Sequence, residues 1–84
     1  MASLTLDDVR RIVKEARFDG RVPDLSAMDL SNMDLSYVDL SDANLSDANL
    51  RGADLTDAVL TGANMRGATL LYTYLDDEHL DAHN

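Results

Sequence analysis

The 84 residues of this chain make one small domain, and the absence of cysteine excludes disulfides and thiolate metal sites. Five basic and four acidic side chains give residues 1–21 a charge of +1, whereas two basic and twelve acidic ones give residues 22–84 a charge of -10. An acidic body argues against binding nucleic acid through its phosphates, and it allows binding to a basic protein surface or simply keeps the protein soluble.

Nothing in the chain has the pattern of a membrane segment. No apolar run approaches the roughly 20 residues that a membrane-spanning helix needs. Asp7, Asp8 and the Arg10–Arg11 pair interrupt any apolar stretch of a signal peptide. A basic amphipathic helix can also lie on a membrane surface, but the acidic residues near the N-terminus oppose this. We therefore expect a cytoplasmic protein that has no membrane partner.

Residues 5–18 are predicted to form an amphipathic helix. Thr5 is the expected N-cap, with Asp8 three positions later in place of the usual Glu or Gln of a capping box. Gly20 is the expected end of the helix. The apolar face comprises Leu6, Val9, Ile12, Val13 and Ala16. We assign residues 1–21 to this N-terminal capping helix.

From residue 25 onward, an apolar residue recurs at every fifth position. The twelve members are Leu25, Leu30, Leu35, Leu40, Leu45, Leu50, Leu55, Leu60, Met65, Leu70, Leu75 and Leu80. A small or apolar residue usually stands two positions before each member, and an Asp or Asn usually stands between the two. A period of five fits neither a helix nor a strand with alternating faces. The backbone must therefore turn a corner every five residues so that each member returns to one interior.

Three consecutive segments, residues 43–47, 48–52 and 53–57, read A-(D/N)-L-x-x. They resemble the signature of the pentapeptide-repeat family. The resemblance implies an all-β solenoid, a right-handed quadrilateral β-helix with four repeats per coil. Residues 22–82 would then form about three coils, with residues twenty apart stacked, and residues 83–84 would be a tail.

The first coil differs from the later ones at its small inward positions. Met28, Met33 and Val38 stand where the later coils have Ala. Larger side chains there can extend past the edge of the coil toward a cap. We therefore expect the helix to lie across the open end of the first coil, with Leu6, Val9 and Val13 packed on Met28 and Met33.

The C-terminal repeats carry apolar side chains at positions that should face outward. These are Val59, Leu71, Tyr72 and Tyr74, which form a candidate surface for self-association or for a partner. In some proteins of the family the C-terminal coils form a two-fold dimer, so the resemblance implies a homodimer through this end. A different protein or the acidic tail could instead cover the same residues.

No constellation in the sequence supports catalysis or a cofactor. His79 and His83 form a two-histidine pair near acids, which is weak evidence for a metal without a third ligand. The repeated serines have no histidine base near them, and Gly52, Gly62 and Gly67 fall at the corner position of the repeat. We expect no enzyme activity, no catalytic residue, no cofactor and no metal.

The sequence favours a non-catalytic structural or protein-interaction module that presents a rigid acidic β-helix surface to a protein partner. The alternative is a DNA-mimic inhibitor of a type II topoisomerase (DNA gyrase), a role known in the family that the acidic charge also fits. The length opposes this alternative, since three coils, even doubled, span roughly 30 Å, which is less than one turn of DNA.

Overall fold

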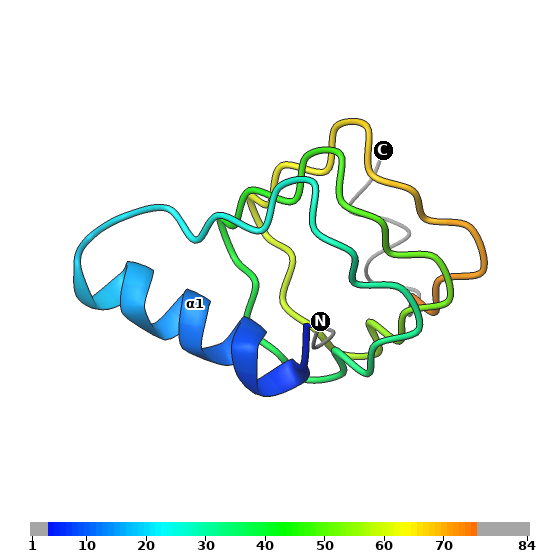
Figure 1. The fold of residues 1–84 in the computed structure, drawn as a ribbon, viewed down its shortest axis with the longest axis horizontal. Helices are drawn as coiled ribbons and strands as arrows, with labels where there is room; N and C mark the ends of the chain where they lie inside the picture. Colours follow the sequence, from blue (N-terminus) through cyan, green and yellow to red (C-terminus); the bar gives the residue numbers. More distant parts are fainter. Residues whose placement is uncertain (1–3, 76–84) are drawn as a thin grey trace.

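The computed structural model of this protein describes residues 4–75, so the expected repeats after residue 75 and the tail at 83–84 lie outside the described residues. One helix, α1 (Leu6–Phe18), precedes a chain that winds into stacked coils (Figure 1). Within residues 4–75, no helix has the length and apolar character needed to cross a membrane.

Isolated parallel β-bridges join neighbouring coils, and each bridge pairs one residue with the residue twenty positions later. The seven bridges are Asp24 with Asn44, Asp29 with Asn49, Asp34 with Asp54, Asp39 with Val59, Asn44 with Asn64, Asn49 with Thr69 and Asp54 with Tyr74. Four repeats therefore make one turn, and we number the coils as residues 24–43, 44–63 and, for the described part of the third, 64–75. Within residues 4–75, each bridge joins only one residue of one coil to one residue of the next. Longer strands do not form there because a turn interrupts the extended backbone in every repeat.

A tight turn follows each inward Leu. In the first repeat the Met28 N–H donates to the Leu25 carbonyl (3.4 Å), and Ala27 has a positive φ of 58°. A positive φ at the second central residue is the mark of a type II turn. Asp24 supports this turn, since its Oδ1 accepts from both the N–H (3.0 Å) and the Oγ–H (2.6 Å) of Ser26. The left-handed position recurs at Ala27, Asn32, Tyr37, Asp42, Asp47, Gly52, Asp57, Gly62, Gly67 and Tyr72.

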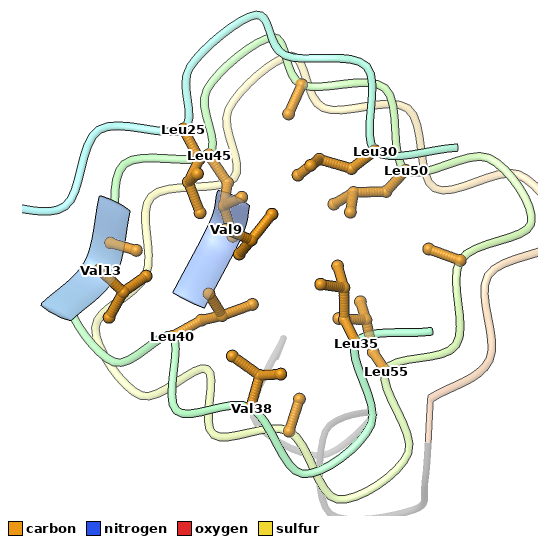
Figure 2. Close-up of a cluster of buried hydrophobic side chains, with 14 residues drawn as sticks. Val9, Val13, Leu25, Leu30, Leu35, Val38, Leu40, Leu45, Leu50 and Leu55 are labelled. Carbon is orange, nitrogen blue, oxygen red and sulfur yellow. The ribbon is translucent and has the colours of Figure 1, made fainter. Parts of the chain in front are cut away.

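The repeated Leu side chains fill the interior of the coils. Seven of the repeated leucines have no exposed surface, namely Leu25, Leu30, Leu35, Leu40, Leu45, Leu50 and Leu55. Figure 2 shows the stacking, with Leu25 beside Leu45, Leu30 beside Leu50 and Leu35 beside Leu55. Toward the C-terminal end the interior is less covered. Leu60, Met65, Leu70 and Leu75 are only partly buried there.

Helix α1 lies against the mouth of the first coil. Thr5 is its N-cap and forms a capping box with Asp8, whose backbone N–H donates to Thr5 Oγ1 (3.2 Å) and whose carboxylate accepts from the Thr5 N–H (2.8 Å). Val9 and Val13 are buried and lie near Leu25 and Leu40 (Figure 2). Other apolar residues are partly buried against the same core, among them Leu4, Leu6, Ile12, Met28 and Met33.

Arg17 of α1 closes part of the coil edge. Its Nη2 donates to the carbonyls of Asp39 (3.1 Å) and Ser41 (3.0 Å) and lies 3.7 Å from the Asp39 carboxylate. One coil later, the matching carbonyls of Val59 and Thr61 accept backbone N–H groups from the first coil instead (2.8 and 2.9 Å). The Arg17 guanidinium thus donates to two edge carbonyls that would otherwise accept backbone N–H groups from a preceding coil.

We predict that acid destabilises the coil through its repeated carboxylates. Hydrogen bonds from the Ser Oγ–H, and then from the Ser backbone N–H, lower the pKa of four carboxyls below the ordinary 3.8, namely those of Asp24, Asp29, Asp34 and Asp39. Since the folded pKa lies below the unfolded one, this stabilisation is complete well above pH 3.8 and is lost as the pH falls through the folded pKa.

Urea unfolding followed by circular dichroism from pH 7 down to pH 2 would measure this loss. Ser31→Ala removes the Oγ–H that donates to Asp29 Oδ1 (2.6 Å), so its stability should fall less steeply in acid than that of the wild type. A stability that rises as the pH falls would contradict the prediction. It would show that repulsion among the acidic side chains outweighs these hydrogen bonds.

Candidate interaction surface

Three exposed apolar side chains gather on the last described coil. Leu71 and Tyr72 form a corner and are 52% and 70% exposed, and Tyr74 on the following side is 69% exposed. We call Leu71, Tyr72 and Tyr74 the C-terminal surface. The coil positions them, because Gly52 N–H of the preceding coil donates to the Leu71 carbonyl (3.0 Å). A bridge between Asp54 and Tyr74 fixes the side that carries Tyr74.

The structure places Val59 on the side of the coil next to that of Tyr74, and one coil earlier. Val59 is 43% exposed and pairs by a bridge with Asp39, on the side of the coil that Arg17 reaches. Tyr74 lies in a different outward column, above Asp54 and Asp34. The sequence grouped Val59 with the C-terminal surface by residue type alone, whereas the twenty-residue turn assigns it to another side and to the second coil.

Tyr72 is held in an unusual backbone conformation. Its φ of 61° is in the left-handed region, where Asn32 and Gly52 stand at the same corner of the first two coils. Bulky residues are uncommon there, because the side chain crowds the backbone. The guanidinium of Arg51 lies 5.4 Å from the centre of the Tyr72 ring, within the range of a cation–π contact. The ring is therefore oriented by the coil below it and still leaves most of its surface to solvent.

Tyr37 is a second bulky residue in this conformation, with a φ of 67° and an exposure of 74%. Tyr37 lies in the first coil and Tyr72 in the last coil that the structure describes. The residue pattern did not single out Tyr37. The signal that could have found it is its repeat position, two after Leu35, where Asp, Asn and Gly predominate.

The side chains that could hold a metal or act as nucleophiles are distributed along the repeats of the described residues. Between residues 4 and 75, no three His, Cys, Asp or Glu side chains are grouped so that they could hold a metal ion. His79 and His83 lie outside the described residues. The Ser hydroxyls at 26, 31 and 36 each donate to the Asp of their own repeat, which gives them a role in the turns.

Comparison with known proteins is informative for the repeats. The family model described as pentapeptide repeats matches residues 24–52 and 43–77, with eight copies of the repeat. These matches together cover more than half of the chain. No curated protein and no solved structure gives a match. The resemblance seen in the A-(D/N)-L-x-x segments is confirmed by this result, and the chain belongs to the pentapeptide-repeat family.

Proposed function

We propose that this protein is a non-catalytic interaction module, a right-handed quadrilateral β-helix of the cytoplasm that pairs with a second copy of itself through the C-terminal surface. The observation that carries the proposal is the exposure of Leu71, Tyr72 and Tyr74 on one coil. In the same C-terminal repeats, the inward residues Leu60, Met65, Leu70 and Leu75 are only partly buried. Exposed apolar residues beside an incompletely covered core are typical of an association surface. Family membership supports the β-helix, and the absence of cysteine supports a reducing compartment.

Two modes of self-association can cover such a surface. In a two-fold union the C-terminal surfaces of two copies face each other and bury their aromatic rings. In a head-to-tail union the acidic body of one copy meets the basic side chains of α1 in the next, which are Arg10, Arg11, Lys14 and Arg17. Apolar burial contributes about 25 cal/mol per Å², whereas exposed ion pairs contribute under about 1 kcal/mol each. We therefore favour the closed two-fold dimer over an open filament.

A matched pair of substitutions tests which end associates. Tyr72→Asp and Tyr37→Asp make the same change at the same repeat position, at opposite ends of the molecule, and Asp already occupies this position at residues 42, 47 and 57. Both variants should therefore fold. Tyr72→Asp should weaken the dimer at least about tenfold, because it puts a charge into the buried centre of the interface. Tyr37→Asp should leave the dimer unchanged.

Light scattering over a concentration series measures both variants and the wild type. Circular dichroism provides the folding control for each. Equal dimer affinities for the two variants would contradict the proposal, whether both match the wild type or both are weakened alike.

The second candidate function, inhibition of DNA gyrase by DNA mimicry, is favoured by the exposed carboxylates. Asp24, Asp29, Asp34 and Asp39 are exposed around the first coil, and Asp42 and Asp47 are exposed at corners. The dimensions favour it less, since the molecule measures 31 × 30 × 22 Å and one turn of DNA is roughly 34–36 Å long. A supercoiling assay with purified gyrase separates the two functions. Inhibition at low protein concentration would make this the leading function, and no inhibition at high concentration would exclude it.

A further inference from the structure

The first coil has an edge whose hydrogen-bonding groups are only partly satisfied. In the second coil, the carbonyls of Asn49 and Arg51 accept N–H groups of Leu30 and Asn32 (both 2.8 Å). The matching carbonyls of the first coil are those of Asp29 and Ser31. No donor from residues 4–75 forms a hydrogen bond to them. This side of the coil therefore presents two acceptors toward solvent.

The contacts of Arg17 indicate which kind of donor a pair of edge carbonyls can bind. Asp39 and Ser41 stand ten residues after Asp29 and Ser31, two sides further around the same coil. Their carbonyls both accept from the Arg17 guanidinium, at 3.1 and 3.0 Å, and the Asp39 carboxylate lies 3.7 Å from it. Asp29 and Ser31 repeat this arrangement of two carbonyls and one carboxylate, without an arginine.

A depression adjoins these acceptors. It has a volume of about 390 Å³ and is lined by Leu4, Met28, Asp29, Ser31 and Met33. The two methionines are partly buried, and their flexible thioether side chains adapt to irregular shapes. An arginine needs such a combination, because its aliphatic stem packs on apolar atoms while its planar, weakly hydrated guanidinium donates in parallel to two acceptors.

We infer that the depression at Met28, Asp29, Ser31 and Met33 binds an arginine side chain of a protein partner. The stem lies on the methionines, and the guanidinium donates to the carbonyls of Asp29 and Ser31 and pairs with the Asp29 carboxylate, as Arg17 does with Asp39. A peptide arginine fits better than the free amino acid, whose own carboxylate would face the acidic edge at Asp24, Asp29 and Asp34. Lysine fits less well, since a single ammonium lacks the planar fork.

This site is at the opposite end of the coils from the C-terminal surface. The inference therefore goes beyond the proposed dimer, and each can fail without the other.

A set of matched peptides tests the inference on the full chain. The ¹⁵N-labelled protein is titrated with acetyl-Gly-Gly-Arg-Gly-Gly-amide and with versions carrying lysine or the neutral isostere citrulline. The arginine peptide should give saturable shifts at the amides of residues 28–33, with a dissociation constant on the order of 1 mM. The lysine peptide should bind several-fold more weakly. The citrulline peptide should give no saturable shift.

Two variants locate the contact. Asp29→Asn should weaken arginine binding several-fold, because it removes the charge but keeps the turn, as Asn44 and Asn49 do at the same repeat position. Asp54→Asn is the matched control, since the Asp54 carbonyl already accepts Leu35 N–H (2.8 Å), and its binding should equal that of the wild type. No saturable shift at residues 28–33 up to about 10 mM peptide would overturn the inference. So would equal binding of the arginine and lysine peptides, or an Asp29→Asn variant that binds as the wild type does.

Discussion

Leu45→Asp should abolish the folding of the coil at neutral pH. Leu45 has no exposed surface and lies between two other inward residues of its stack, Leu25 and Met65. A carboxylate there would lose its hydration without gaining a partner, and the cost of about 5 kcal/mol or more is comparable to the whole stability of a small domain. Far-ultraviolet circular dichroism and urea unfolding measure the effect.

The neighbouring residue supplies the control for this prediction. Asn44→Asp introduces the same charge at an outward position, where the Oδ1 atom accepts from Ser46 N–H (3.0 Å) and a carboxylate can do the same. This variant should stay within about 1 kcal/mol of the wild type. Leu45→Ala should fold and lose about 2–5 kcal/mol, which keeps the measurement quantitative if the Asp variant is unfolded. A Leu45→Asp variant as stable as Asn44→Asp would contradict the filled interior.

Val9→Asp should detach α1 from the coil and reduce the free energy of unfolding by about 3–5 kcal/mol. Val9 has no exposed surface and projects into the mouth of the first coil beside Leu25 and Leu40 (Figure 2). Its replacement leaves these leucines open to water and puts a carboxylate among them. Urea unfolding gives the loss, and hydrogen exchange of the amides of α1 shows whether the helix has come away.

Phe18→Asp is the control on the same helix. Phe18 is 91% exposed, so the change alters charge and helix propensity without removing a buried contact. An acid near the last turn opposes the helix dipole, and the expected loss stays below about 1 kcal/mol. Equal losses for the two variants would show that α1 is not an integral cap of the coil.

Residue spacing alone predicted the parts of the fold that depend on local chemistry. Thr5 and Asp8 identify the start of α1 because a capping box needs only neighbouring residues, and the helix begins one residue later, at Leu6. The five-residue period of leucines identifies the turns, and four repeats per coil give the bridges between residues twenty apart. The one-residue length of those bridges could not be read from a leucine pattern, because it depends on how the turns interrupt the backbone.

The candidate site was less predictable, since it depends on contacts across coils and with α1. Val59 was grouped with Tyr74 by residue type, although counting twenty residues back places it above Asp39. The position of Arg51 against Tyr72 also follows from that count, because Arg51 stands at the corner that carries Tyr72 one coil later. The role of Arg17 could not have been found in this way. Its hydrogen bonds to Asp39 and Ser41 depend on where α1 crosses the coil, which no repeat position specifies.

The mass of the wild-type protein in solution, followed by sedimentation equilibrium at low and high salt, tests the proposed self-association most directly. We predict the mass of two chains, with tighter association as salt rises, because screening weakens the repulsion between two acidic bodies while the apolar contact remains. A single chain at every concentration and salt would contradict the account, and so would larger assemblies that dissolve as salt is added.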